Sequence, residues 1–185
     1  MRFRAITKAT AIILAVTCLI VCVAIIAFDW REVRPRLPEI QAAFNTYEPE
    51  DRNVPPNVAD LIWKLDDKQE VHVNAQVAST LVSPSLPMKA GVWHVRNFMW
   101  SLLLPLHFDK QSRTALYCHS LLYENGRGLS SAAAYYFHKQ PHELTSVQVA
   151  GILAIARSPS MNSPTRHPDR YAQNTAHLLN AYATP

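Results

Sequence analysis

The sequence predicts a mostly α-helical protein in which one membrane-spanning helix precedes a small helical domain. Residues 9–28 form an apolar run of about 20 residues without a charge, which at about 1.5 Å of rise per residue matches the hydrocarbon core of a bilayer. Further along, apolar residues recur at intervals of three and four, and proline or glycine breaks separate these segments. We therefore divide the chain into an N-terminal tip and anchor (1–28), a membrane-proximal stalk (29–55) and a folded domain (56–185).

The N-terminal run also has features of a cleaved secretory signal, because Arg2, Arg4 and Lys8 give it a positively charged start. It is longer than the usual apolar core of a signal peptide, about 7–15 residues, and no small-x-small cleavage site precedes Asp29. We therefore favour an uncleaved anchor. Charge alone does not orient it, because three basic residues lie on each side, the second set being Arg31, Arg34 and Arg36.

Charge and cysteine content exclude two kinds of site in the domain. Three of the 18 Lys and Arg residues precede the anchor, and the other 15 lie beyond it with all 14 Asp and Glu residues. This near balance predicts a mixed solvated surface and no nucleic-acid partner. Cys118 is the single cysteine of the domain, and His138 and His142 are separated by Pro141 without an evident third ligand, so we expect no disulfide there and no metal site.

The segments that follow the anchor differ in how firmly they predict structure. Residues 29–58 carry five prolines and are typical of a stalk, interrupted by one short helix around residues 39–47. Pro56 starts a helix whose apolar residues have helical spacing: Val58, Leu61, Ile62 and Leu65. Residues 70–82 alternate enough for a strand or an irregular loop, and this choice stays open.

A second strongly apolar segment lies at residues 91–108. Its apolar side chains recur every three or four residues: Val92, Val95, Phe98, Met99 and Leu102. We expect a helix that Pro105 ends or kinks. Because His94, Arg96 and Asn97 interrupt the apolar run, the pattern favours a buried core helix over a second membrane span.

Helix-start signals recur in the C-terminal half. Asp109 is placed to cap a helix over residues 110–123, which the glycines at 126 and 128 end. A helix over residues 130–138 follows, and Thr145 and Gln148 have capping-box spacing ahead of a helix that is apolar almost all round. With a last amphipathic helix over residues 169–183, the domain is mostly α with room for one short hairpin.

Over roughly residues 109–182 the chain carries an ordered series of landmarks. They are Gly126 and Gly128, Ala132 to Ala134, Tyr136 and Phe137 with Lys139, Leu144 and Thr145, Ala150 to Ala156, Ser158 to Pro164, and Pro168 to Arg170. This order resembles the C-terminal part of the peptidoglycan glycosyltransferase domain, glycosyltransferase family 51. The series is more specific than any one motif within it.

The resemblance implies a lysozyme-like α domain outside the cytoplasm, held in a bacterial inner membrane by a single-pass anchor whose N-terminal tip is cytoplasmic. It implies as partners the membrane, a lipid-linked peptidoglycan precursor or glycan strand, and cell-wall synthesis proteins. The family joins a glycan on a lipid pyrophosphate to the 4-hydroxyl of a lipid-linked disaccharide. That reaction requires a carboxylate to accept a proton, and cations or a metal to stabilise the leaving pyrophosphate.

Upstream, three family motifs are altered. In the family, the first motif has Glu-Asp followed by Phe and His, and the Glu acts as general base. Residues 54–69 resemble the lead-in to this motif, but Asp66 and Asp67 stand in place of the Glu-Asp pair. Aspartate is one methylene shorter, and a misplacement of about 1 Å can cost on the order of 100-fold. A second motif is matched at Ser79 and Thr80 without its glutamines, and an Arg-Lys-x-x-Glu helix falls on residues 93–97 with Asn97 in place of Glu.

These changes predict a catalytically degenerate homologue with a precursor-binding or scaffolding role in cell-wall assembly. The alternative is an active transglycosylase centred on Asp66, the one case in which a cofactor, a divalent cation, is expected. Arg127, between two glycines, is the leading candidate for binding pyrophosphate. Further substrate-binding candidates are Lys139, Ser79, Thr80 and Arg96, with Lys110 and Arg113 as additional cations. A lytic transglycosylase is disfavoured because none of the seven glutamates precedes a serine.

Overall fold

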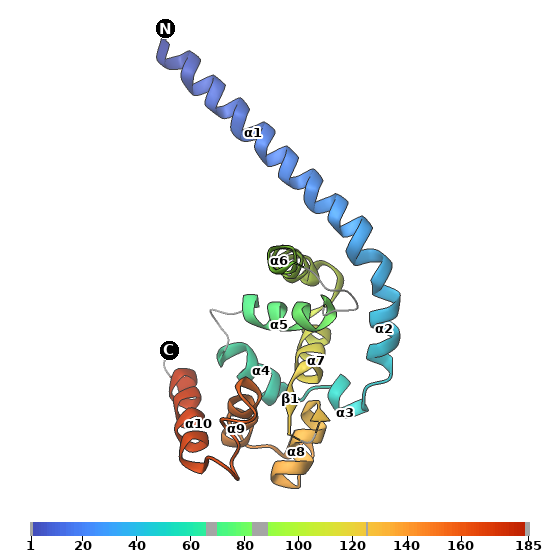
Figure 1. The fold of residues 1–185 in the computed structure, drawn as a ribbon, viewed down its shortest axis with the longest axis vertical. Helices are drawn as coiled ribbons and strands as arrows, with labels where there is room; N and C mark the ends of the chain where they lie inside the picture. Colours follow the sequence, from blue (N-terminus) through green and yellow to red (C-terminus); the bar gives the residue numbers. More distant parts are fainter. Residues whose placement is uncertain (1, 66–69, 83–88, 125, 184–185) are drawn as a thin grey trace. The chain divides into compact units, whose positions relative to one another are not determined.

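The computed structural model describes residues 2–65, 70–82, 89–124 and 126–183 (Figure 1). Its secondary structure is almost entirely helical, which confirms the predicted fold class. The chain divides into two compact units, Met1–Gln41 and Ala42–Pro185. Residues 42–55, which the sequence places in a stalk, therefore fall within the second unit, where Asp51 and Val54 are buried.

The first unit is almost entirely helical, and its last helix ends at Asn45, four residues beyond the boundary of the unit. Helix α1 (Arg2–Phe28) passes through a π-helical turn, η1 (Asp29–Val33), and a 3-10 turn, η2 (Arg34–Arg36), into α2 (Leu37–Asn45). Among the described residues, one helix, which includes residues 12–45, is long and apolar enough to cross a membrane. Charged contacts begin where the apolar run ends, because Arg34 Nε donates to Asp29 Oδ2 at 2.7 Å and the guanidinium lies 4.7 Å from the Trp30 ring centroid.

The second unit is a set of short helices with one small hairpin. Its elements are α3 (Pro49–Arg52), α4 (Pro56–Leu65), α5 (Glu70–Val82), α6 (Ala90–His107), α7 (Lys110–Ser120), β1 (Leu122–Tyr123), β2 (Gly126–Arg127), α8 (Leu129–Phe137), η3 (Pro141–Glu143), α9 (Ser146–Arg157) and α10 (Pro168–Ala183). Helix α5 packs against α6 and α7, and α9 packs against α10, α4 and α8. Residues 70–82 are helical, so both structures that the sequence pattern suggested for them, a strand and an irregular loop, were wrong.

Helix α9 lies at the centre of the core. Every residue from Val149 to Ile155 is buried, which accounts for a sequence that is apolar almost all round. Helix α4 adds Val58, Leu61 and Ile62 to the same core cluster. Gly151 allows α10 to approach closely, because a methyl group at this position would collide with the Tyr171 hydroxyl.

Two predicted helix caps are confirmed. Asp109 accepts a hydrogen bond from the Ser112 amide at 2.7 Å at the start of α7. Thr145 and Gln148 form a reciprocal capping box at the start of α9. Both caps satisfy amides that the first turn of a helix leaves without a partner.

Helix α6 corrects one expectation. The segment is helical and Pro105 lies within the helix, two residues before its end. The prediction that it is a buried core helix was wrong, because Trp100, Leu103 and Leu104 are buried while Val95, Phe98 and other apolar residues are exposed. The helix packs against α5 and α7 on one side, so only that side enters the core.

Candidate functional site

Arg127 ends strand β2 of the hairpin, and a glycine lies on each side of it just before α8. The hairpin pairs Leu122 with Arg127 and Tyr123 with Gly126 in antiparallel register. Gly126 has φ of 136° and Gly128 has φ of 93°, conformations that cost glycine little and other residues more. The two glycines therefore place an exposed Arg127 directly before the first turn of α8.

A buried carboxylate from α3 fixes this turn. Asp51 is 5% exposed, and its Oδ1 accepts hydrogen bonds from the Ser130 amide and the Ser130 hydroxyl, each at 2.8 Å. Its Oδ2 lies so close to Gly128 that a Cβ there would be 2.7 Å away. A carboxylate at a helix N-terminus accepts hydrogen bonds from first-turn amides, and its negative charge interacts favourably with the helix dipole. Asp51 thus holds the start of α8, and with it the Arg127 turn, against α3.

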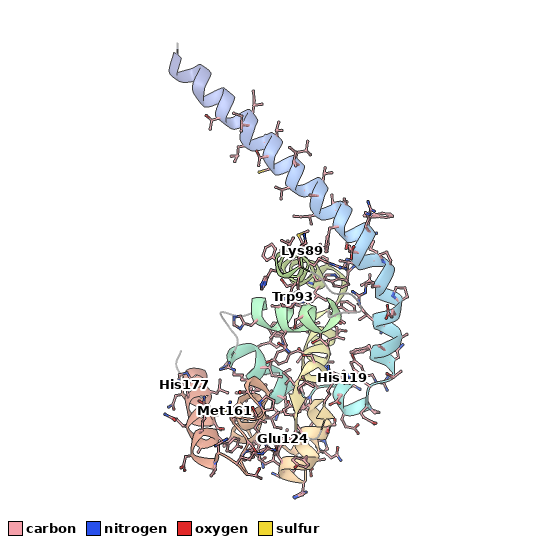
Figure 2. All side chains as sticks on the ribbon, viewed as in Figure 1. Lys89, Trp93, His119, Glu124, Met161 and His177 are labelled. Carbon is pink, nitrogen blue, oxygen red and sulfur yellow. The ribbon has the colours of Figure 1, made fainter. Side chains whose placement is uncertain are left out.

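An aromatic pair belongs to the same region. The rings of Tyr47 and His119 stack with centroids 3.5 Å apart and planes 17° from parallel, and Figure 2 shows His119 at the end of α7. Burial lowers the pKa of His119; Asp51 opposes this effect and Arg127 adds to it. Burial raises the pKa of Tyr47, and Arg127 opposes that shift. We call Tyr47, Asp51, His119, Arg127 and Ser130 the Arg127 cluster.

A Glu-Asp pair that the sequence analysis did not consider includes Asp51 of this cluster. Glu50 is exposed and directly precedes Asp51, and together they form the one Glu-Asp dipeptide of the sequence. The family resemblance calls for such a pair in the first motif, which the sequence analysis assigned to Asp66 and Asp67. Those two residues lie outside the described part of the chain. The dipeptide makes residues 50 and 51 a second candidate position for that motif.

Three predicted substrate-binding residues, Ser79, Thr80 and Arg96, lie on α5 and α6 and not on the elements that carry Arg127. The hydroxyls of Ser79 and Thr80 donate to the Gln76 carbonyl at 2.8 and 3.1 Å, so both engage the backbone of their own helix. Arg96 is half-buried on α6, which packs against α5. These three residues therefore lie on two neighbouring helices, separate from the elements that carry Arg127.

Lys139 is separated from Arg127 by the length of α8. Arg127 precedes this nine-residue helix and Lys139 follows it, so about 13 Å of helix lies between them. The Lys139 ammonium donates to Gln148 Oε1 at 3.2 Å, and the same oxygen accepts from the Thr145 amide at 3.0 Å. Lys139 thus lies between α8 and α9, where it contacts the capping box of α9.

Lys110 and Arg113 form a separate cation group around Trp63. The Lys110 ammonium lies 5.0 Å and the Arg113 guanidinium carbon 5.3 Å from the Trp63 ring centroid. Arg113 is buried and donates to Asn74 Oδ1 at 3.0 Å. This arrangement ties α7 to α4 and α5, which is a packing role.

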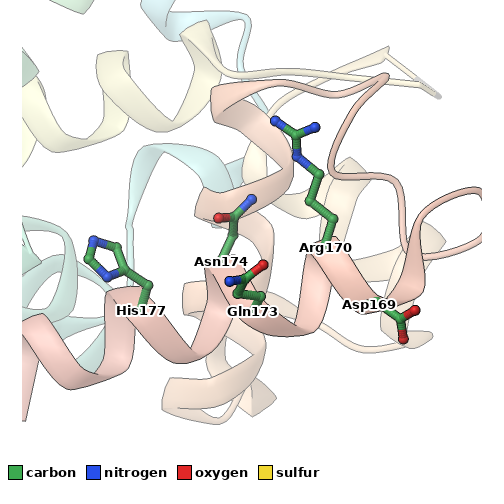
Figure 3. A pocket seen from close by; sticks show the side chains of 5 residues that line it. All are labelled: Asp169, Arg170, Gln173, Asn174 and His177. Atoms are coloured by element: carbon green, nitrogen blue, oxygen red, sulfur yellow. The ribbon is translucent and has the colours of Figure 1, made fainter.

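Two hollows lie elsewhere on the second unit. The one in Figure 3 is lined by five residues of a single helix, α10: Asp169, Arg170, Gln173, Asn174 and His177. A second, of about 370 Å³, lies among α5, α7 and α9 and is lined in part by Gln76, Tyr117 and Arg157. Neither contains a predicted site residue. Within the described residues, no group of three or more His, Cys, Asp or Glu side chains is arranged to hold a metal ion.

Comparison with known proteins identifies the pattern that these elements carry. The family model described as transglycosylase matches residues 73–183 and so includes most of α5 and all of α6 as well as the C-terminal landmarks. A relative, penicillin-binding protein 1F of Bacillus subtilis (strain 168), is 34% identical over 73 residues, which cover 39% of this chain and 10% of that protein. The chain thus aligns with about a tenth of the length of this curated relative.

Proposed function

Because the chain belongs to the transglycosylase family, we propose that it binds the lipid-linked peptidoglycan precursor, or a glycan strand made from it, at the Arg127 cluster. The observation that supports this most is the contact between Asp51 and the start of α8, which fixes the turn that presents Arg127. A guanidinium donates paired hydrogen bonds to phosphate oxygens, so a fixed, exposed arginine suits a pyrophosphate group.

The proposed role is binding or scaffolding without efficient turnover. The family resemblance assigns a second carboxylate to the helix that corresponds to α6. Helix α6 carries no Asp or Glu between Ala90 and His107, so it lacks this second carboxylate. Loss of this carboxylate is compatible with retained pyrophosphate binding, because binding needs donors and not a placed base.

The second candidate function is an active transglycosylase. The position of Glu50 beside the Arg127 cluster favours it. Glu50 is exposed and directly precedes Asp51 in the chain. Asp51 in turn contacts the turn beside Arg127. In this version of the site, Glu50 accepts the proton of the attacking hydroxyl and Arg127 stabilises the departing pyrophosphate. Asp66 remains the alternative base.

We further propose that α1 anchors the protein in a bacterial inner membrane, with the second unit on the extracytoplasmic side. The support is an apolar helix long enough to cross a bilayer and the partial match to a penicillin-binding protein. In this setting the second unit is tethered where the lipid-linked precursor lies. Cell-wall synthesis proteins are the expected protein partners.

The test uses the full-length protein in lipid nanodiscs and a fluorescent lipid-linked precursor. We expect Arg127→Ala to weaken binding by about 10- to 100-fold, since a hydrogen-bonded ion pair contributes about 1.5–3 kcal/mol. Arg170→Ala, an exposed cation on α10, is the matched control and should leave binding unchanged. Equal binding by Arg127→Ala and the wild type would reject this site.

Polymerisation assays separate the two functions. The scaffold proposal expects precursor binding without glycan chains from the wild type. Chains made by the wild type and lost in Glu50→Gln would establish the active alternative with Glu50 as its base, and chains lost in Asp66→Ala would assign the base to Asp66.

A further inference from the structure

The hollow of about 370 Å³ is lined by residues of α5, α7, α9 and strand β1. Its volume falls within the range of about 300–1,000 Å³ that is usual for small-molecule pockets. On each helix the lining residues are three or four positions apart, so one side of each helix faces the space. From α5, α7 and α9 in turn, they are His72 and Gln76, Tyr117 and Ser120, and Leu153, Ala156 and Arg157.

Part of this lining is aliphatic. It includes three leucines, Leu121, Leu122 and Leu153, together with Ala156 and Pro159. Leu121 and Leu153 are buried in the core cluster, whereas the side chain of Leu122 is 49% exposed. Leu122 is therefore free to cover an aliphatic group that enters from solvent, and removal of such a group from water favours binding.

Arg157 supplies the charge of the hollow. It is exposed at the end of α9, and within the described residues its guanidinium has no carboxylate partner. None of the described residues that line the hollow is Asp or Glu. A guanidinium stays charged and donates two parallel hydrogen bonds to a carboxylate. One permanent positive charge matches a carboxylate better than a phosphate monoester, which carries about −1.5 to −2 charges at pH 7.

Hydrogen-bonding groups complete the lining. The His72 imidazole, the Gln76 amide and the Tyr117 hydroxyl are able to bond a polar ligand. The Ser120 hydroxyl donates to the Tyr117 carbonyl at 2.7 Å, which leaves its oxygen to accept. Helices α7 and α9 end here, at Ser120 and Arg157, and the last carbonyls of a helix have no partner within it. The hollow thus offers acceptors for an N–H group beside a cation for an acid.

We propose that this hollow binds an acylated α-amino acid with an aliphatic side chain, either free or at the C-terminus of a peptide. Its carboxylate pairs with Arg157, its aliphatic group packs against Leu122 and Leu153, and its amide N–H donates to the acceptors at the helix ends. No member of the Arg127 cluster is among the described residues that line the hollow. The inference therefore stands apart from the proposed binding of precursor.

The test measures binding to the full-length protein in nanodiscs by ligand-observed NMR, with empty nanodiscs as the blank. The probes are N-acetylleucine and N-acetylleucinamide, in which an uncharged amide replaces the carboxylate. We expect wild type to bind the acid about 10-fold more tightly than the amide, the lower end for a hydrogen bond to a charged group, because Arg157 is exposed. Arg157→Met should bind both probes equally weakly. Equal binding of the two probes by wild type would overturn the inference.

Two further variants assign the contacts. Arg170→Ala removes an exposed cation of α10 and is the matched control, so it should keep the preference for the acid. Loss of the preference in this variant too would mean that the acid responds to surface charge in general, which overturns the site. Leu122→Ser should weaken both probes alike and keep their ratio, because it removes an aliphatic contact only. Unchanged binding by Leu122→Ser would contradict the proposed position of the ligand.

Competition defines the class of ligand. Displacement of N-acetylleucine by an equal concentration of inorganic phosphate would overturn the assignment of a carboxylate. The peptide acetyl-Ala-Ala-Leu separates the two sources of the same chemistry. Binding at least as tight as that of N-acetylleucine supports a peptide C-terminus, and weaker binding supports a free acylated amino acid.

Discussion

The carboxylate of Asp51 accepts both polar hydrogens of Ser130, one from the backbone amide and one from the hydroxyl, across 79 positions of sequence. This pair joins α3 to the first turn of α8 and lies beside the only turn in which the described chain combines two positive-φ glycines with an arginine. The stability of the second unit and the placement of Arg127 therefore depend on the same carboxylate.

Replacement of Asp51 should destabilise the protein. We expect Asp51→Ala to lower the free energy of unfolding by about 1–3 kcal/mol, because it leaves two half-buried donors of Ser130 without their acceptor. Asp51→Asn should cost less, since its amide oxygen still accepts. Urea denaturation of the full-length protein in detergent measures both, with the exposed neighbour Glu50→Ala expected within about 0.5 kcal/mol of wild type. A wild-type midpoint for Asp51→Ala would contradict the cap.

Gly128 should not tolerate a side chain. Gly128→Ala places a Cβ at a φ of 93° and 2.7 Å from Asp51 Oδ2, so we expect a loss of about 1–3 kcal/mol from strain and displacement of the carboxylate. Gly91→Ala is the matched control, because nothing lies within 4 Å of a Cβ there and alanine favours a helix by about 0.5–1 kcal/mol. Thermal denaturation should move in opposite directions for the two variants, and equal shifts would argue against the close contact.

His119 should make stability depend on pH. Burial lowers its pKa in the folded protein below the ordinary 6.5, so as pH falls through 6.5 the unfolded chain takes up the proton first. The contribution of the neutral imidazole is complete above pH 6.5 and declines as pH approaches the lower folded pKa. Asp51 favours the charged form and Arg127 disfavours it.

The comparison is between wild type and His119→Gln over a series of pH values. We expect wild type to lose stability relative to His119→Gln as the pH drops below 6.5, measured as the difference in denaturation midpoint. Parallel curves through this range would show that the folded and unfolded pKa values of His119 are equal.

Cys118 should be chemically silent in the folded state. It is fully buried, and burial raises the pKa of its thiol, with Asp51 adding to the effect, so little thiolate is present to react. In a Cys18→Ser, Cys22→Ser background, maleimide should modify Cys118 only after unfolding in urea, as followed by mass spectrometry. Val147→Cys in the same background should react under native conditions. Prompt native modification of Cys118 would contradict its burial.

Local signals in the sequence predicted local structure well. The Asp109 cap and the Thr145–Gln148 capping box are confirmed because each depends on residues three apart in one turn. The all-round apolar pattern of α9 was sufficient to predict burial. For residues 70–82 the alternating pattern suggested a strand or an irregular loop, and both were wrong: the segment is a helix that packs on α6 and α7.

Long-range relationships were not predictable in the same way. The apolar pattern of α6 indicated a helix but not which side neighbouring helices would cover, so its burial was predicted wrongly. Arg127 was identified from its glycine turn, whereas its connection to Asp51 depends on the packing of α3 against α8. Lys139 belongs to a later landmark of the same series, and helix α8 lies between it and Arg127.

The contact between Asp51 and Ser130 also shows that the folded domain extends beyond the residues that the family model matches. The family match begins at Val73, but the cap of α8 comes from Asp51, and Val54, Val58, Leu61 and Ile62 belong to the core cluster. A polypeptide that starts at Val73 therefore lacks both a wall of the core and the carboxylate that closes α8. The smallest autonomous folding unit extends at least as far back as α3.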